Sequence, residues 1–542
     1  MSFVQPAPRL ADPYRNDRVL QSWLARVLPE AQRRAAEPSF VALAEYAQRT
    51  YARQTSTVPT EPVLTNWDVW GRRVDRIELT TTWREGPAIA ARHGLVADGH
   101  DKSLGAFGRV QQFAKVYLYH AASAFYSCPL AMTDGVATAL RDAPNVELRT
   151  RVLAHLLSRD PSTFWISGQW MTENAGGSDV GDSETTARKA ADGSWRLCGR
   201  KWFTSAINAP VALALARPEG NPAGADGLAL FCIETHDGDG AWNGISIDRL
   251  KDKLGTRELP TAEIHLRDTR AELVGETAHG VRAVTPVLQV TRLWNAFGSL
   301  STMARCLALV RDYARGRRVF GKPLAKQPLF ADSLAGWEAE FEAAFHLAMQ
   351  VALLLGRVES GTGDARDAAL QRLLTPLAKL WVCKLGVRIA SETVEAFGGI
   401  GYLEDSGIPL LLRDAQVLPI WEGASNVQAL DFLRALDKLG IEPLVNATDA
   451  WLEAADGVLP DTDVEAIHAA VRHADTWLRD HARDADALQA GALRLGNTCA
   501  RSAAAALLAR HAAWAERVQA DAASTTALRR FCAHGLDRIQ FS

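Results

Sequence analysis

The hydrophobic positions recur at two different spacings along the chain. In residues 1–165, and again from about residue 280, apolar residues stand three or four positions apart, which is the spacing of one face of an α-helix. Between residues 163 and 273 the chain is instead rich in glycine. It consists there of short apolar runs, such as Val211–Ala216 and Leu228–Glu234, separated by turn clusters. Such runs predict a small antiparallel sheet or barrel.

This order predicts an α+β protein that is mostly α-helical. We expect four domains: an N-terminal helical domain over residues 1–165, a central β-sheet domain over 166–278, a helical bundle over 279–440 and a C-terminal helical extension over 441–542. The prolines near the N-terminus favour an extended arm before the first helix. Helices on either side of a sheet do not form the strand–helix alternation of a Rossmann domain, and no GxGxxG motif is present.

One helix of the expected bundle has a clear apolar stripe, formed by Leu370, Leu374, Leu377, Trp381 and Leu385. Lys379, Lys384 and Arg388 stand mostly off that stripe. The pattern is typical of an amphipathic bundle helix with its charged face away from the core.

Composition and charge restrict the class of protein. The 542 residues are 47% hydrophobic and 23% charged, and 60 basic against 63 acidic residues leave a net charge of -3, which excludes a globally basic nucleic-acid binder. The seven cysteines are odd in number and never spaced as CxxC, so we expect no disulfide framework, no metal site and a cytoplasmic location. We expect no membrane span, because no apolar run reaches the ~18 residues that a span needs. We also expect no secretory signal, because the first twenty residues are charged and contain no apolar stretch.

Two segments of the expected β domain suit a polar or aromatic ligand. Residues 170–179 combine hydroxyls, two adjacent glycines and backbone N–H groups, which suit a phosphate or the polar edge of a ring. Residues 199–205 place an aromatic pair, Trp202 and Phe203, beside two hydroxyls, so that they can stack on a ring and bond its edge. Taken singly, an ordinary loop and a strand end with a core tryptophan are the more common explanations of these two segments.

Two segments of the expected bundle offer positive charge and close approach. Arg317 and Arg318 stand at the end of a predicted helix, just before a Gly and a Pro, and either clamp a pyrophosphate or cap the helix. Residues 398–401 contain three glycines, which let other backbone or a ligand come close.

Glu422 is the candidate general base. It follows the apolar run 418–421, and such surroundings raise the pKa of a carboxyl group towards the neutral range that a base requires. The alternative is a surface acid at the start of a helix, with Asn426 as the helix cap.

Together and in this order, the segments resemble the signature of the acyl-CoA dehydrogenase family. The matching motifs are Met171–Asp179, Gly199–Thr204, Arg317–Pro323, Gly398–Tyr402 and Glu422-Gly423. The chain also resembles the AidB-like branch of adaptive-response flavoproteins through the arm at residues 5–8 and the segments 68–75, 128–133 and 249–255. That second resemblance extends over the C-terminal helices.

The resemblance implies a noncovalently bound FAD between the β domain and the bundle. It also implies a homotetramer in which a neighbouring subunit completes each site. The cofactor-binding residues that it implies are Gln169, Met171, Thr172, Gly177, Ser178, Trp202, Phe203, Thr204, Ser205, Arg317, Gln327, Gly398, Gly399, Ile420, Gly423, Ser425 and Asn426.

The reaction that the resemblance implies is α,β-dehydrogenation of an acyl thioester. Glu422 would remove the α proton while the β hydrogen leaves as hydride to flavin N5. The substrate would be an acyl-CoA or another acyl-type molecule, and the electron acceptor an electron-transfer flavoprotein or oxygen.

A second interpretation is an AidB-type FAD protein that binds DNA or a lipid and turns over little. The candidate DNA contacts in the C-terminal region are Arg494 and Arg501, and Arg510 and Arg517, because each pair is seven residues apart and shares a helix face. A solvated face or an oligomer contact explains the same arginines.

Overall fold

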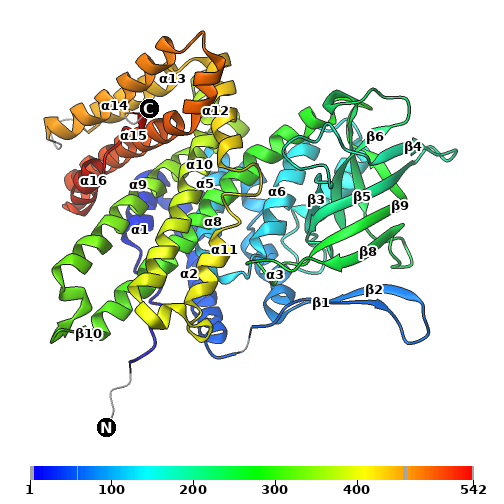
Figure 1. The fold of residues 1–542 in the computed structure, drawn as a ribbon, viewed down its shortest axis with the longest axis horizontal. Helices are drawn as coiled ribbons and strands as arrows, with labels where there is room; N and C mark the ends of the chain where they lie inside the picture. Colours follow the sequence, from blue (N-terminus) through cyan, green and yellow to red (C-terminus); the bar gives the residue numbers. More distant parts are fainter. Residues whose placement is uncertain (1–4, 58, 456–459, 540–542) are drawn as a thin grey trace. The chain divides into compact units, whose positions relative to one another are not determined.

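The computed structural model describes residues 5–57, 59–455 and 460–539 (Figure 1). Its contacts divide the chain into two compact units, each made of segments that are not contiguous in sequence. Unit 1 comprises residues 1–57, 101–122 and 295–542, and unit 2 comprises residues 58–100 and 123–294.

Unit 1 is built almost entirely from helices. They are α1 (Arg18–Val27), α2 (Glu30–Gln54), α5 (Gly108–Tyr119), most of α8 (Gly280–Gly316), α9 (Pro328–Glu359), α10 (Ala365–Ala396), α11 (Ile408–Ala415), α12 (Ser425–Leu439), α13 (Glu442–Glu453), α14 (Asp461–Asp480), α15 (Ala485–Gln519) and α16 (Ala523–Ala533). Short 3₁₀ turns occupy Lys102–Phe107, His120–Ala122, Leu324–Lys326, Gly398–Tyr402 and Glu404–Ser406, and Arg318–Val319 pairs with Lys322–Pro323 as the hairpin β10–β11.

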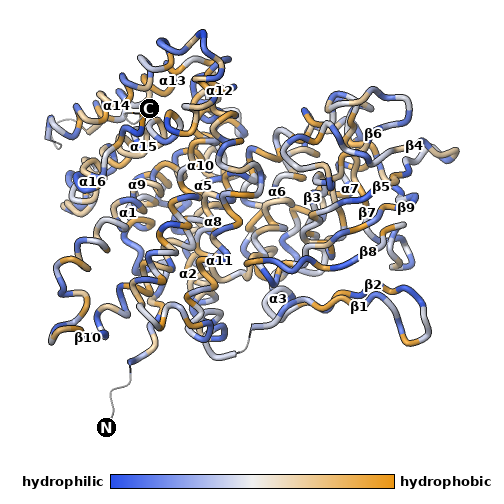
Figure 2. The backbone as a smooth tube through the Cα atoms, viewed as in Figure 1, coloured by the Kyte–Doolittle hydropathy of each residue, from blue (hydrophilic) through white to orange (hydrophobic). Residues whose placement is uncertain are grey.

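The core of unit 1 is formed where α9, α10 and α15 pack side by side (Figure 1). Helix α9 is long and apolar enough to cross a membrane, but 83% of its most apolar stretch is buried inside the protein, as in a core helix. Along the chain, hydrophobic and hydrophilic positions alternate within the helices (Figure 2), and this amphipathic pattern is what lets them pack as a bundle.

Helix α10 confirms the predicted apolar stripe, and all five residues of that stripe are buried. The charged positions were predicted only in part. Lys384 and Arg388 are exposed, as expected, but Lys379 is only 1% exposed. Helix α10 is covered on more than one side, by α9, α12 and α15, so a residue off the main stripe is still inside the protein.

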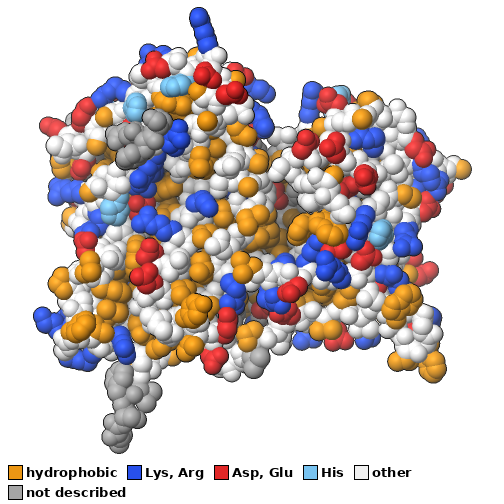
Figure 3. Space-filling view, in the orientation of Figure 1, with side chains coloured by type: hydrophobic (Ala, Val, Ile, Leu, Met, Phe, Trp, Pro, Cys, Tyr) orange, Lys and Arg blue, Asp and Glu red, His pale blue; other side chains and the backbone are white. Residues whose placement is uncertain are grey.

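The C-terminal helices are fixed to the bundle by a buried ion pair. Arg501 of α15 forms a bidentate contact with Glu340 of α9, at 2.8 and 3.1 Å, and both side chains are buried. The proposed DNA-facing stripe is therefore wrong at this position, because a buried and paired guanidinium cannot meet a phosphate backbone. On the face of the molecule seen in Figure 3, basic and acidic side chains are interspersed.

Unit 2 contains a seven-stranded sheet and the helices that pack on it. The strands are β3 (Ser167–Trp170), β4 (Thr186–Lys189), β5 (Trp195–Ser205), β6 (Val211–Pro218), β7 (Ala229–Glu234), β8 (Ile245–Leu250) and β9 (Thr261–Leu273), in the order β3-β6-β4-β5-β9-β7 with β8 beside β9. The helices of this unit are α3 (Thr81–His93), α4 (Ala97–His100), α6 (Ser127–Arg141), α7 (Val146–Leu156) and the start of α8, and a further 3₁₀ turn covers Ala225–Gly227.

The central β module is confirmed, but the sheet is mixed rather than purely antiparallel. Strand β6 pairs in parallel with both β3 and β4. The chain leaves β3 and returns to β6 only after β4 and β5, which supply the long connection that a parallel pair needs. Strand β6 is buried along nearly its whole length because alternate residues face two cores: Leu213 and Leu215 one, Ala212 and Ala214 the other.

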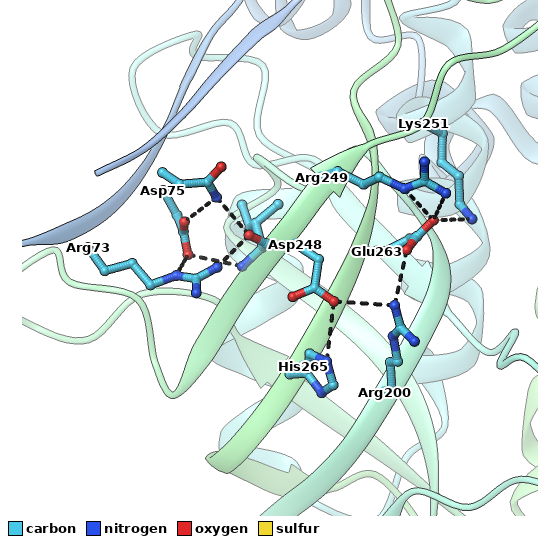
Figure 4. Close-up of polar contacts among 10 residues, drawn as sticks. Arg73, Asp75, Arg200, Asp248, Arg249, Lys251, Glu263 and His265 are labelled. Atoms are coloured by element: carbon cyan, nitrogen blue, oxygen red, sulfur yellow. Dashed lines mark hydrogen bonds and ion pairs between the residues drawn. The ribbon is translucent and has the colours of Figure 1, made fainter. Parts of the chain in front are cut away.

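A two-stranded hairpin lies within the region expected to be helical. Strands β1 (Val63–Trp67) and β2 (Arg73–Glu78) pair antiparallel. The buried carboxylate of Asp75 connects this hairpin to the sheet, since it accepts hydrogen bonds from Asn66 (2.8 Å), Arg73 (2.8 Å) and the backbone N–H of Ile247 in β8 (3.0 Å) (Figure 4).

Candidate active site

In unit 2, a buried ion pair fixes the loop that follows β3. The ammonium of Lys201 lies 2.5 Å from Glu173 Oε1 and also donates to the carbonyl of Leu215 at 2.8 Å. Glu173 accepts further hydrogen bonds from the hydroxyl of Thr185 and the backbone N–H of Glu184. Burial opposes ionisation of this carboxyl group, but Lys201 and these hydrogen bonds outweigh it and lower the pKa of Glu173.

The same loop is held along strand β5. The backbone N–H of Trp202 donates to the carbonyl of Thr172 at 3.0 Å. A Cβ at Gly177 would come within 2.6 Å of Thr172 Oγ1, so a side chain there would displace the threonine. The glycine therefore keeps the loop close to Thr172.

The predicted ligand residues of this loop differ in how available they are. Ser178 is exposed and Thr172 half-buried, so both can reach a ligand. Gln169 is half-buried, and its Oε1 is a buried acceptor without a partner among the described residues. Met171 packs in the core with α6 and α7, so only its backbone is available.

The end of β5 presents aromatic surface. Phe203 is 50% exposed, although it lies at a strand end of a well-packed sheet. Thr204 is buried, and its hydroxyl donates to the carbonyl of Ala262 at 2.6 Å. Ser205 is half-buried and shares a hydrogen bond of 3.1 Å with Thr261. The side chains that this strand offers to a ligand are therefore Phe203, its neighbour Trp202 and, in part, Ser205.

Lys251 is a residue that the sequence reasoning did not assign to the site. Its ammonium lies 3.5 Å from the ring centroid of Trp202 and 4.4 Å from that of Phe203, within the range of cation–π contacts. The sequence analysis included it only in the segment 249–255, which resembles the AidB branch. Its contact with the aromatic pair depends on how the loop after β8 lies against β5, and residue spacing does not show this.

A carboxylate holds Lys251 in this position. Glu263 is buried and pairs with Lys251 at 2.8 Å, with Arg249 at 2.7 Å and with Arg200 at 3.1 Å (Figure 4). Burial alone would raise the pKa of Glu263, but the hydrogen bonds from Arg249 and Lys251 lower it. The three cations share one counter-charge here, and Asp248 supplies a second one to Arg200 at 3.4 Å.

In unit 1, Arg317 lies just after the end of α8. Its backbone N–H donates to Tyr313, and its carbonyl accepts from Leu324 at 2.7 Å, so the backbone is fixed. Its half-buried guanidinium has no hydrogen-bond or ion-pair partner among the described residues. Gln327 is engaged differently, since its amide donates to the carbonyl of Val319 at 2.8 Å and closes the β10–β11 turn.

The three glycines after α10 have separate roles. Gly398, at φ 61°, follows the helix in the left-handed region, and neither it nor Gly399 has an atom within 4 Å of a Cβ position. Both therefore leave open space. Gly401 is structural, because a Cβ there would come within 2.2 Å of the carbonyl oxygen of Val394.

Glu422 lies in a turn with an uncommon backbone. Its φ is 57° and that of Gly423 is 93°, and a left-handed conformation is costly for a residue with a side chain. Two side chains hold the turn. Lys379 of α10 donates to the carbonyl of Gly423 at 2.5 Å, and Gln428 of α12 donates to the carbonyls of Glu422 at 2.8 Å and Gly423 at 3.0 Å. Sequence reasoning missed Lys379 because it stands 44 residues before its partner.

The alternative of a capped helix start at Asn426 is wrong. Helix α12 begins at Ser425, its N-cap is Ala424, and no side-chain cap hydrogen bond is present. Glu422 is half-buried and precedes the helix. Of the apolar run before it, Leu418 is buried, whereas Ile420 is 61% exposed.

The residues of each unit, taken by themselves, suit a part of a flavin dinucleotide. The guanidinium of Arg317 can pair with a pyrophosphate, and the unpartnered Oε1 of Gln169 can accept from a ring N–H. The exposed ring of Phe203 offers a stacking surface. Among the described residues, no group of three or more His, Cys, Asp or Glu side chains is arranged to hold a metal ion.

Three known protein-family models match most of residues 5–436. Residues 5–160 match "Adaptive response protein AidB N-terminal domain". Residues 168–269 match "Acyl-CoA dehydrogenase, middle domain", and residues 278–436 match "Acyl-CoA dehydrogenase, C-terminal domain".

Individual relatives agree with these families. The chain is 41% identical to acyl-CoA dehydrogenase family member 11 of Caenorhabditis elegans over 449 residues, which cover 80% of this chain and 72% of that protein. It is 36% identical to AidB of Escherichia coli (strain K12) over 390 residues, covering 70% and 69%.

Two solved structures share the fold. The crystal structure of C. elegans ACDH-11 in complex with C11-CoA has a TM-score of 0.94 at 35% identity, and the match covers 99% of this chain and 93% of that one. An acyl-CoA dehydrogenase of Bacillus anthracis, complexed with FAD, has a TM-score of 0.70 at 18% identity, covering 96% and 85%, and shows the fold alone.

We predict that Glu173→Gln destabilises the protein by about 3–5 kcal/mol, because it leaves the buried ammonium of Lys201 without its carboxylate. Urea unfolding measures the change. Since the pKa of Glu173 is lowered in the folded state, the contribution is present at neutral pH and is lost as the pH falls through that pKa. Glu184→Gln, at an exposed position of the same loop, should change stability by less than ~0.5 kcal/mol. Equal changes in stability for the two substitutions would contradict a specific stabilising role of the Glu173–Lys201 ion pair.

Proposed function

Because the chain belongs to the acyl-CoA dehydrogenase family, we propose that Glu422 is the catalytic base of its reaction. The protein is an FAD-dependent oxidoreductase that acts on the CH–CH bond of acyl-CoA compounds. The solved structure of the C. elegans relative contains C11-CoA, which supports an acyl-CoA of similar chain length as the first substrate to test.

The observation that carries the proposal is the turn at Glu422. A left-handed residue persists only where its surroundings impose it, and such strain is typical of functional sites. Here the amide of Gln428 and the buried ammonium of Lys379 hold the two carbonyls of the turn. A carboxylate on a turn fixed in this way keeps one position while it takes up a proton.

The chain's own residues have distinct tasks in the reaction. The carboxylate of Glu422 takes the α proton of the thioester, and partial burial limits competition from water. FAD, when bound, supplies the acceptor for the β hydride. Arg317 is proposed to hold the pyrophosphate of the cofactor, and Trp202 and Phe203 to lie along its ring. An electron-transfer flavoprotein or oxygen stays the predicted electron acceptor.

We predict that Glu422→Gln keeps the fold and the bound FAD, because the amide is nearly isosteric with the carboxylate. The rate of flavin reduction by acyl-CoA should fall by about 10²–10⁴-fold, the contribution of a positioned base. Anaerobic stopped-flow absorbance measures this rate. Glu442→Gln, at an exposed acid of α13, should reduce its flavin as fast as the wild type. If Glu422→Gln also did so, another group would be the base.

Lys379 is proposed as a positioning residue for this base. Lys379→Met keeps the length of the side chain but removes the donor to Gly423, so the turn should lose part of its fixed geometry. We expect kcat to fall by about 10–100-fold, with FAD content and KM close to the wild type. Lys384→Met, at an exposed position of the same helix, is the control. A loss of FAD, or a rise in KM with unchanged kcat, would show that Lys379 acts elsewhere.

We further propose that the protein is a homotetramer. Large apolar side chains are exposed next to the proposed cofactor segments: Phe320 is 98% exposed, and Leu329 and Tyr402 are also exposed. Such surface favours contact with another subunit. Sedimentation should give about four times the 58.9 kDa of one chain, and Phe320→Asp should give smaller species. A wild-type protein that sediments as a single chain with FAD bound would contradict this assembly.

A further inference from the structure

Three helices of unit 1 bring a cluster of basic side chains together. The cluster consists of Arg26 on α1, His346 on α9, and Arg510 and His511 on α15. The rings of His346 and His511 have centroids 4.5 Å apart. Arg510 donates to the side-chain oxygen of Gln350, one turn after His346, at 2.8 Å. We refer to these four residues as the basic cluster.

The basic cluster has no counter-charge. No carboxylate among the described residues pairs with Arg26 or Arg510. The Nε atoms of both arginines, both ring nitrogens of His346 and Nδ1 of His511 are buried and have no hydrogen-bond partner in the described part of the chain. Both histidines are almost completely buried. Unpaired cations and unsatisfied polar atoms are costly inside a protein.

The protonation of these groups reflects their surroundings. Burial, together with Arg510, lowers the pKa of Arg26 to about 9, and burial lowers that of Arg510 to about 10. Burial and the nearby arginines lower the pKa of His511 to about 3, so this ring is neutral at physiological pH. The nearest acids on α9 and α15 have other partners, because Glu342 pairs with Arg18 and Glu516 accepts a hydrogen bond from Thr525.

An open cavity lies beside two of the helices that carry the cluster. Arg18 of α1 and Glu342 of α9 line an open cavity of about 520 Å³ in unit 1. Arg26 and His346 stand one to two turns further along the same helices, and neither of them lines this cavity. Arg26 and Arg510 are themselves only partly buried, which leaves the cluster within reach of a small ion.

We propose that the basic cluster is a binding site for a phosphate group, with inorganic phosphate as its simplest ligand. Two uncompensated guanidinium groups match the charge of a dianion. Arg26 and Arg510 can each donate several N–H groups in the planar arrangement that suits phosphate oxygens. His346 adds one donor in either neutral tautomer.

His511 gives the site a preference among oxyanions. Ser22 donates its hydroxyl proton to Gln519 at 2.6 Å, so its oxygen accepts from Nε2 of His511 at 3.0 Å. The tautomer assigned by these contacts leaves Nδ1 of His511 as an acceptor. Hydrogen phosphate carries a hydroxyl that can donate to this atom, whereas sulfate does not. The site should therefore prefer phosphate to sulfate.

Titration calorimetry of the FAD-loaded protein with inorganic phosphate tests the proposal, with sulfate at equal ionic strength as the second ligand. We expect the wild type to bind phosphate more tightly than sulfate. Arg26→Gln and Arg510→Gln should each weaken phosphate binding by about 10–100-fold, the usual effect of losing a charged hydrogen bond. Arg479→Gln removes the same charge at an exposed position of α14 and should bind phosphate as the wild type does.

A melting experiment separates binding from misfolding. In phosphate-free buffer, Arg26→Gln should melt at or above the temperature of the wild type, because it removes an unpaired cation. Added phosphate should raise the melting temperature of the wild type and of Arg479→Gln, but not that of Arg26→Gln. The proposal is overturned if the wild type does not respond to phosphate, if it responds equally to sulfate, or if Arg26→Gln binds phosphate like the wild type.

Discussion

The turn at Glu422 and Gly423 exists because side chains from two helices hold its carbonyl oxygens. A left-handed residue with a side chain costs on the order of 1–3 kcal/mol, and the hydrogen bonds from Lys379 and Gln428 offset that cost. Lys379 can do this only because α10 is buried on several sides by α9, α12 and α15. The packing of the bundle, including the ion pair between Arg501 and Glu340, therefore fixes the geometry of the proposed base.

Unit 2 uses a buried lysine in a comparable way. Lys201 holds the loop after β3 through Glu173 and a backbone carbonyl, as Lys379 holds the turn at Gly423. In both places a long side chain extends from a strand or helix and holds a loop in place. The backbone hydrogen bonds of helices and strands do not reach these loops. The basic cluster differs from the Lys201–Glu173 pair in its charge balance. Lys201 has a carboxylate partner, whereas Arg26 and Arg510 of the basic cluster have none among the described residues.

The sequence predicted most of the elements and the order of the motifs, because hydrophobic spacing and turn residues are local signals, but it missed the β1–β2 hairpin. It did not predict which charged residues are buried. Lys379 and Arg501 look like solvated positions on amphipathic helices, and only the packing of several helices around them places them inside. The parallel pairing of β6 and the contact of Lys251 with Trp202 were missed for a related reason. Both depend on segments that are distant along the chain, and residue spacing carries no information about such pairs.

The most direct test of this account is an anaerobic titration of the purified, FAD-loaded protein with an acyl-CoA, beginning with the C11-CoA that the structure of the C. elegans relative contains. The account predicts that the oxidised flavin spectrum bleaches in proportion to the acyl-CoA added and that an equal amount of the α,β-unsaturated thioester is formed. It is contradicted if acyl-CoA binds while the flavin stays oxidised and no unsaturated product appears.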